Sequence, residues 1–185
     1  MLQGYDFGAP ERKFHRPEAG ITVTDGRVVE GYASLFGRRD QGGDVVQAGA
    51  YAASLARLIA EGRRVKMLWQ HDPAQPIGVW DEVREDATGL YVKGRILGEV
   101  ERGREAAALL AAGAIDGLSI GYRTLRAERD GKGQRLLAEL ELWEVSLVTF
   151  PMLPEARVSA KGESPEDWRE LAQLFEDARQ GMAGL

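Results

Sequence analysis

Residues 117–150 read GLSIGYRTLRAERDGKGQRLLAELELWEVSLVTF, and this stretch decides the fold class. Apolar residues run through 118–125 and again through 134–142, with the sequence Asp130-Gly131-Lys132-Gly133 between the two runs. Apolar runs on either side of a glycine-rich turn are typical of a β-hairpin. The second run continues as an apolar strand until Pro151. The sequence therefore predicts a long antiparallel hairpin.

The remainder of the chain repeats this pattern of strands and tight turns. Consecutive strands joined by tight turns favour an antiparallel sheet over alternating strand–helix units. We expect a mostly β member of the α+β class: a bent, partly closed antiparallel β-barrel of about six or seven strands with about three flanking helices. The other expected strands are 28–36, 65–70, 77–83 and 90–96, and the expected helices are 50–61, 101–112 and a third that begins at Ser164.

Three segments are expected along the chain. Residues 1–19 are rich in glycine, proline and charge, which predicts a flexible N-terminal arm. Residues 20–160 form the main domain. Residues 161–185 form a C-terminal helix or tail, in which Ser164-Pro165-Glu166-Asp167 is a helix start and Trp168, Leu171 and Phe175 share one face.

Composition excludes several classes of protein. The chain has 185 residues, no cysteine and a net charge of −5. It therefore has no disulfide and no thiolate zinc site, and its charge argues against nucleic-acid binding. No apolar run reaches the roughly 18–20 residues of a membrane span, and no signal peptide is recognisable, so we expect a cytoplasmic protein. No cofactor is expected.

One histidine and one serine are the candidate reactive groups. His71 follows the expected strand 65–70 in Trp69-Gln70-His71-Asp72, and Ser119 lies between Gly117 and Gly121. A serine hydroxyl is a weak nucleophile until a positioned base takes its proton, and histidine is the usual base. Gly-Leu-Ser-Ile-Gly fits the hydrolase elbow pattern literally. It lacks the required context, because a strand rather than a helix is expected after Ser119.

A base of this kind needs an acidic partner to orient it. Asp72, Asp116 and Glu144 are the candidates. Asp72 is adjacent to His71 and would point the opposite way along a strand. Asp116 sits where the preceding turn ends. Glu144 lies in an apolar strand, where a carboxylate either has a buried partner or faces water at an edge.

Four blocks in order resemble the HK97-type prohead protease family of tailed phages and related gene transfer agents. They span about Glu30 to Ala156. The opening block is Gly31-Tyr32-Ala33-Ser34-Leu35-Phe36 with Asp44 and Gly49-Ala50-Tyr51, and the later blocks are Met67-Leu68-Trp69-Gln70-His71-Asp72 with Pro76-Ile77-Gly78, Gly117-Leu118-Ser119-Ile120-Gly121-Tyr122, and Glu144-Val145-Ser146-Leu147-Val148-Thr149-Phe150-Pro151.

The resemblance implies a serine endopeptidase with a fold similar to the herpesvirus assembly proteases. It implies His71, Ser119 and Glu144 as the catalytic residues, with backbone oxyanion donors near Met152 and Leu153. The implied substrates are the scaffold region of the major capsid protein and the protease itself, inside the prohead in the host cytoplasm. A homodimer is a further implication. Nucleic acid, membrane and metal are not implied.

Two other readings stay open from the sequence. The first is a non-catalytic scaffold or capsid-binding module on the same fold, which could dock through the 161–185 segment. The second is a metal hydrolase with Asp40, Asp44, Asp72 or Glu144 as ligands around His71.

Overall fold

The computed structural model describes residues 11–15, 22–24, 27–40 and 42–149. The strands are β1 (Glu11–His15), β2 (Thr22–Thr24), β3 (Val28–Leu35), β4 (Asp44–Val46), β5 (Lys66–Trp69), β6 (Asp72–Glu85), β7 (Gly89–Ile96), β8 (Gly117–Arg129) and β9 (Arg135–Val148), and the helices are α1 (Ala52–Ala60) and α2 (Glu101–Ala111). Together the strands form one sheet in the order β1-β8-β9-β5-β6-β7-β3-β2, with β4 paired to β9 off this path.

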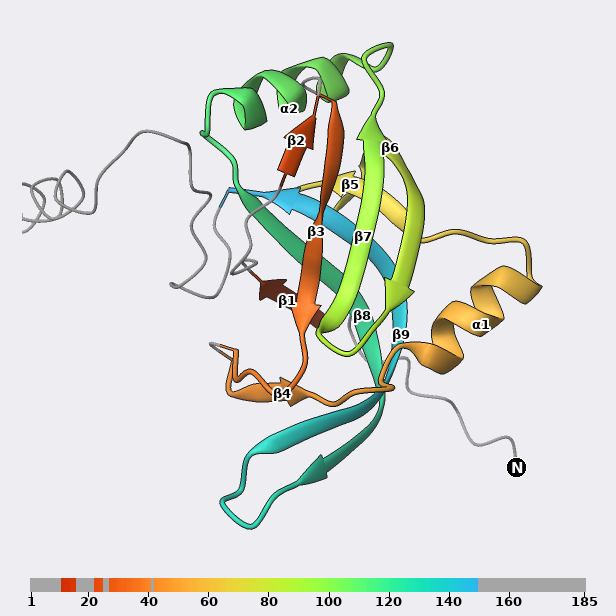
Figure 1. Ribbon diagram of the computed structural model, residues 1–185, viewed down its shortest axis with the longest axis vertical. Coiled ribbons are helices and arrows are strands. Elements are labelled where there is room, and N and C mark those ends of the chain that lie inside the picture. The colour runs from red at the N-terminus through yellow and green to blue at the C-terminus, as the bar shows by residue number, and fades with distance from the viewer. Residues whose placement is uncertain (1–10, 16–21, 25–26, 41, 150–185) are drawn as a thin grey trace, which may run out of the picture.

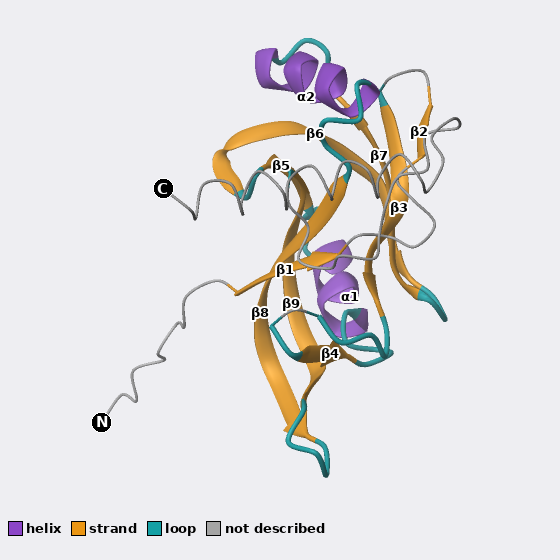
Figure 2. Ribbon diagram, turned by 90° about the vertical axis from the view of Figure 1, so that its left-hand side faces the viewer, coloured by secondary structure: helices purple, strands orange, loops and turns teal. Residues whose placement is uncertain are grey.

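The sheet curls into a half-barrel. β3, near one end of the strand order, contacts both β1 and β8 at the other end. Helix α2 lies over one end of the half-barrel (Figures 1 and 2), and α1 lies at its side (Figure 1). This arrangement confirms the mostly β, partly closed architecture expected from the sequence. β3 and β5 to β9 correspond to the six expected strands, while β1, β2 and β4 are three to five residues long and give no periodic signal.

Three details of the expected organisation differ from the structure. The sheet, expected to be antiparallel, is mixed, because β4 and β5 each pair with β9 in parallel. Residues 11–15, inside the expected flexible arm, form strand β1 and pair with β8. Pro73 and Pro76, expected in a loop after His71, lie within β6, where irregular register against β5 accommodates them. The third expected helix, at 164, lies outside the described residues.

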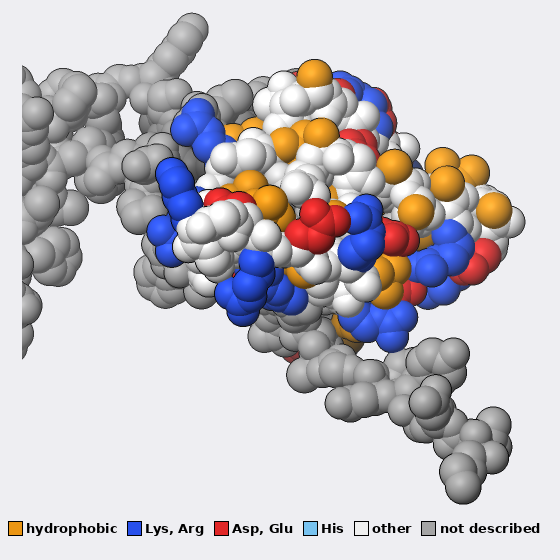
Figure 3. Space-filling model, turned by 90° about the horizontal axis from the view of Figure 1, so that it is seen from below, with side chains coloured by type: hydrophobic (Ala, Val, Ile, Leu, Met, Phe, Trp, Pro, Cys, Tyr) orange, Lys and Arg blue, Asp and Glu red, His pale blue; other side chains and the backbone are white. Residues whose placement is uncertain are grey.

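The β8–β9 hairpin dominates the sheet, as its sequence predicts. The two strands pair antiparallel from Gly117↔Val148 to Arg129↔Arg135, with three register shifts along the way. The far end of the hairpin projects beyond the rest of the half-barrel (Figure 1). Basic and acidic side chains are interspersed on the face seen from below (Figure 3), and Arg126–Glu128 is one pair from this hairpin. The basic side chains on this face therefore belong to a surface of mixed charge that is open to solvent.

The core fills the inner face of the curled sheet. Alternate residues of β8 and β9 point inward, because successive side chains of a strand face opposite sides. Trp80 of β6 packs into this core, and its indole N–H donates to the carbonyl of Val145 at 3.1 Å. The hydrophobic core includes Val29, Met67, Ile77, Trp80, Leu90, Val92, Leu118, Ile120, Leu140, Val145 and Leu147. Among the described residues, no helix is long and apolar enough to cross a membrane.

Candidate active site

His71, Ser119 and Glu144 lie on three adjacent parts of the sheet. Ser119 is on β8, Glu144 is on β9, and His71 is in the turn that follows β5. These strands are neighbours in the order β8-β9-β5. The two residues that are 48 positions apart in sequence, His71 and Ser119, are therefore separated by a single strand.

The turn that carries His71 has an uncommon backbone. Gln70 and His71 join Trp69 to Asp72, which are paired residues of β5 and β6. Their φ angles are +52° and +63°. Positive φ at both central residues defines a type I′ hairpin turn, which normally uses Asn-Gly. Left-handed backbone at non-glycine residues costs of order 1–3 kcal/mol each and is concentrated at functional sites.

Gln70 fastens this turn to the end of β9. Its backbone N–H donates to the carbonyl of Leu147 at 3.0 Å. Its side-chain amide donates to the hydroxyl of Thr149 at 2.6 Å. These contacts hold the left-handed turn against β9, and so they fix the backbone position from which the His71 side chain extends.

His71 and Glu144 form a buried pair. The Nδ1 atom of His71 lies 2.5 Å from Oε1 of Glu144, and the two side chains are 4% and 10% exposed. A carboxylate at Nδ1 favours the tautomer in which Nδ1 donates, so that Nε2 carries the lone pair. Of the two open readings for Glu144, the structure has the buried carboxylate with a partner.

Ser146 also holds the carboxylate of Glu144 in place. Its hydroxyl donates to Oε2 of Glu144 at 2.5 Å and accepts the backbone N–H of His71 at 3.2 Å. Both carboxylate oxygens are therefore bonded, one to the imidazole and one to Ser146. A single serine thus ties Glu144 to the turn that bears its histidine partner.

Ser119 lies directly across from Ser146. The two are paired residues of the antiparallel β8–β9 ladder, and both are fully buried. Paired residues of such a ladder point to the same face of the sheet, with Cα atoms about 4.5–5.5 Å apart. Ser119 therefore shares one face with Ser146 and Glu144, opposite the core-facing Leu118 and Ile120. It lies near the start of β8 and is followed by strand rather than helix, which agrees with rejecting the hydrolase elbow.

Gly121 leaves the space that the Glu144 carboxylate occupies. Gly121 pairs with Glu144 across the ladder. A Cβ atom on Gly121 would meet Oε1 of Glu144 at 2.2 Å, which is closer than atoms can approach. The glycine that follows Ser119 by two positions is therefore required by the carboxylate.

The other two acidic candidates, Asp72 and Asp116, lie on other segments than Glu144. Asp72 accepts the backbone N–H of Ala74 at 2.9 Å at the exposed start of β6. Asp116 lies in the segment before β8. Within the residues that the structure covers, no three His, Asp or Glu side chains gather as a metal site would need. A groove of about 500 Å³ between α1 and β6 is lined by none of the three candidate residues.

Sequence reasoning singled out His71, Ser119 and Glu144 and missed Ser146 and Gln70. Ser146 alternates with Glu144 along β9, and this two-residue spacing was the available signal. The left-handed turn at Gln70 was not predicted, because the usual sequence signal for such a hairpin turn is Asn-Gly or Asp-Gly. Met152 and Leu153 lie outside the described residues.

Known proteins resemble this chain in sequence and in fold. Residues 14–170 match the model of the caudovirus prohead serine protease family. The prohead protease of Enterobacteria phage HK97 is 31% identical over 136 residues, which are 72% of this chain and 59% of the HK97 protein. The chain thus spans less than two thirds of that relative's length.

The likeness in fold extends to a solved structure. The capsid assembly protease gp21 of bacteriophage T4 superposes with a TM-score of 0.61, covering 77% of this chain and 98% of gp21 at 17% identity. At that identity the likeness concerns the fold alone. The match to the family model covers most of the chain, including the turn of His71 and the strands that carry Ser119 and Glu144. The chain belongs to the caudovirus prohead serine protease family.

Proposed function

We propose that this protein is a serine endopeptidase that acts in capsid maturation, with Ser119 as nucleophile, His71 as general base and acid, and Glu144 as the carboxylate that orients His71. The observation that carries the proposal is the buried Glu144–His71 pair beside the strand of Ser119. An exposed ion pair would not support the proposal in this way, because such pairs are common on protein surfaces and contribute little to stability.

The chemistry follows from the proposed roles. Nε2 of His71 takes the hydroxyl proton of Ser119 while the oxygen attacks a peptide carbonyl carbon. The imidazolium that forms is stabilised by the carboxylate of Glu144. His71 then gives the proton to the leaving amine as the peptide C–N bond breaks, and water hydrolyses the ester on Ser119 with His71 again acting as base.

The negative oxygen of the tetrahedral intermediate needs hydrogen-bond donors. From the resemblance to the herpesvirus assembly proteases, we assign them to backbone N–H groups near Met152 and Leu153. Pro151 itself has no N–H to donate. Loss of one such donor typically lowers kcat by about 10²–10³-fold.

The substrates we propose are the scaffold region of a major capsid protein and the protease itself. Support comes from the family, whose members act in proheads, and from the relative named as a prohead protease. Cleavage would then take place inside the assembling prohead in the host cytoplasm, with a homodimer as a further proposal.

The decisive test compares the wild-type chain with Ser119→Ala. We expect a fluorophosphonate probe to label the wild-type chain at Ser119 and to leave the variant unlabelled. Intact mass spectrometry of each chain with co-expressed capsid protein should show processing that falls at least about 10³-fold in the variant. Unchanged processing by Ser119→Ala would overturn the proposal and favour a non-catalytic capsid-binding role.

A further inference from the structure

Strand β1 occupies the outer edge of the strand that carries Ser119. Glu11–His15 pairs antiparallel with residues 118–122 of β8, in the register Phe14↔Ser119 and Lys13↔Ile120. The other edge of β8 is already paired with β9 along its whole length. Within the described part of the chain, β1 is therefore the only strand that pairs with β8 on its outer side.

Without β1, β8 would be the edge strand of the sheet at the nucleophile. An edge strand presents a row of backbone N–H and C=O groups to which another extended chain can pair. Peptide recognition by strand addition uses this property, with main-chain hydrogen bonds that accept many sequences. A protease needs its target backbone extended beside the nucleophile, and this edge provides that position.

The register brings the β1 backbone to the reacting serine. Paired residues of an antiparallel ladder have Cα atoms about 4.5–5.5 Å apart, so the backbone at Phe14 passes next to Ser119. Ser119 has no exposed surface in this structure. An incoming peptide cannot take the edge position while β1 holds it.

We propose that the outer edge of β8 is the site at which an extended peptide substrate binds as an added antiparallel strand, and that residues 11–15 occupy it as a built-in competitor. This inference rests on the proposed function. The ligand class is an unfolded polypeptide segment, recognised chiefly through its backbone. The family match begins at residue 14, so most of β1 precedes the matched region.

A tethered competitor should weaken peptide binding strongly. A segment linked to its own site acts at an effective concentration in the millimolar range. Disrupting β1 should therefore expose the edge and raise the affinity for a peptide in trans. Adjacent residues of a strand direct their N–H groups to opposite sides, so prolines at two successive positions remove at least one ladder donor.

The experiment uses the full chain in a Ser119→Ala background, so that the peptide stays intact. A fluorescent synthetic peptide of residues 8–18 is titrated into this chain with or without Lys13→Pro and Phe14→Pro. The matched control carries Gln3→Pro and Gly4→Pro, which lie before β1. Fluorescence anisotropy should give a Kd at least about tenfold lower for the β1 variant than for the other two chains.

Equal Kd values in the three chains, or equal binding of a peptide that itself carries both prolines, would overturn the inference. If the β1 variant fails to fold, hydrogen exchange on the Ser119→Ala chain tests the proposal instead. Excess peptide should increase exchange at residues 11–15 while residues 118–122 stay protected, and unchanged exchange at 11–15 at saturating peptide would reject the proposal. Fluorophosphonate labelling of wild-type Ser119 tests the chemistry separately from strand binding.

Discussion

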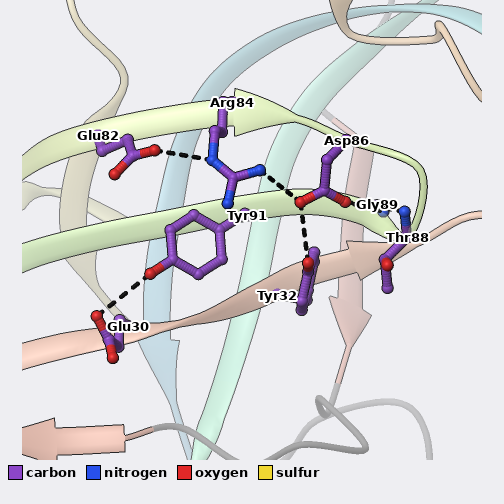
Figure 4. A network of polar contacts seen from close by, with 8 residues as sticks. All are labelled: Glu30, Tyr32, Glu82, Arg84, Asp86, Thr88, Gly89 and Tyr91. Atoms are coloured by element: carbon purple, nitrogen blue, oxygen red, sulfur yellow. Dashed lines mark hydrogen bonds and ion pairs between the residues drawn. The ribbon is translucent and has the colours of Figure 1, made fainter.

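Two clusters of charged and polar side chains lie on different parts of the same sheet. The first, which we call the surface network, comprises Glu30, Tyr32, Glu82, Arg84, Asp86, Thr88, Gly89 and Tyr91 on β3, β6, β7 and the β6–β7 turn (Figure 4). The second, the buried cluster, comprises His71, Ser119, Glu144 and Ser146. The surface network has more interactions, yet it is the buried cluster to which we assign the proposed chemistry.

Arg84 is the centre of the surface network. Its guanidinium donates to Glu82 at 2.8 Å and to Asp86 at 2.5 Å, and it lies 4.4 Å from the ring centroid of Tyr91. The side chains of Arg84 and Glu82 are 46% and 47% exposed. Water screens such pairs, and each contributes only about 0–1 kcal/mol to stability.

Burial changes what the same kinds of groups can do. A charge removed from water is costly unless a partner satisfies it, so loss of one partner of a buried pair is strongly disruptive. Glu144 has both oxygens bonded and almost no contact with solvent. The comparison teaches that location, rather than the number of contacts, separates a structural network from a candidate reactive site.

The largest expected effect comes from Glu144→Gln. An amide cannot stabilise the imidazolium and can stabilise the wrong tautomer, so we expect kcat/KM to fall by about 10³–10⁴-fold. The matched control is Glu141→Gln on the same strand, where the carboxylate pairs with Arg57 and Arg123 near the surface. Peptide cleavage rates would measure both, and similar losses in the two variants would break the comparison.

Gly121→Ala should reduce activity next most. The added methyl group would displace the carboxylate of Glu144, and a shift of about 1 Å in a positioned group can cost about 10²-fold in rate. Gly131→Ala is the control, because nothing lies within 4 Å of the added atom there. A crystal structure of Gly121→Ala with Glu144 unmoved, or wild-type activity, would contradict the steric argument.

Ser146→Ala tests whether Ser146 is a positioning residue. Loss of one hydrogen bond to the carboxylate should lower kcat by about tenfold, with KM little changed, since a charge-assisted bond contributes roughly 1.5–3 kcal/mol. Ser54→Ala removes a comparably buried hydroxyl, which accepts the backbone N–H of Leu142 on the same strand at 2.9 Å. That control should lose stability without loss of kcat. Equal kcat losses in both variants would indicate a structural role alone.

The smallest expected effect on activity comes from Asp86→Asn in the surface network. Burial raises the pKa of the Asp86 carboxyl, but the Thr88 N–H, the Tyr32 hydroxyl, the Arg84 guanidinium and the Gly89 N–H outweigh it and hold the pKa at about 2. Because the folded pKa lies below the ordinary value of 3.8, this stabilisation is present above about pH 4 and is lost as the pH falls toward 2.

Chemical denaturation at several pH values measures this effect. Wild type should exceed Asp86→Asn in unfolding free energy by about 1 kcal/mol at pH 7, a value reduced for partial solvent exposure. The difference should shrink below pH 4, with cleavage activity unchanged at neutral pH. The control is Asp81→Asn, an exposed partner of Arg95, for which we expect almost no difference. A difference that grew on acidification would contradict the assignment.

Much of the fold was predictable from the sequence. The β8–β9 hairpin and both described helices follow from apolar periodicity and glycine positions. Gly113, with φ of +70°, lies just after the C-cap of α2. Short strands such as β1 escaped prediction, because they have too few residues for a pattern. Their pairing depends on which edge of the assembled sheet is open.

Contacts between distant segments were also beyond the sequence. Helix α1 has no capping side chain of its own at Tyr51. The carboxylate of Glu85, from β6, instead accepts the backbone N–H of Gly49 just before the helix at 2.5 Å. Burial raises the pKa of the Glu85 carboxyl, although hydrogen bonds from the backbone of Gly49, Tyr51 and Ala52 act to lower it.

The residue types at the site were determined by the sequence alone: a histidine after one strand, a serine between glycines, and a carboxylate in an apolar strand. Tertiary structure decided that the histidine pairs with the carboxylate and that the serine lies on the same face of the sheet as the carboxylate. Parallel pairing of β5 with β9, antiparallel pairing of β8 with β9, and a left-handed turn at Gln70 and His71 bring them to one face. Local propensity acts over a few residues, whereas strand register is set by packing of the whole sheet, and so only the folded chain fixes it.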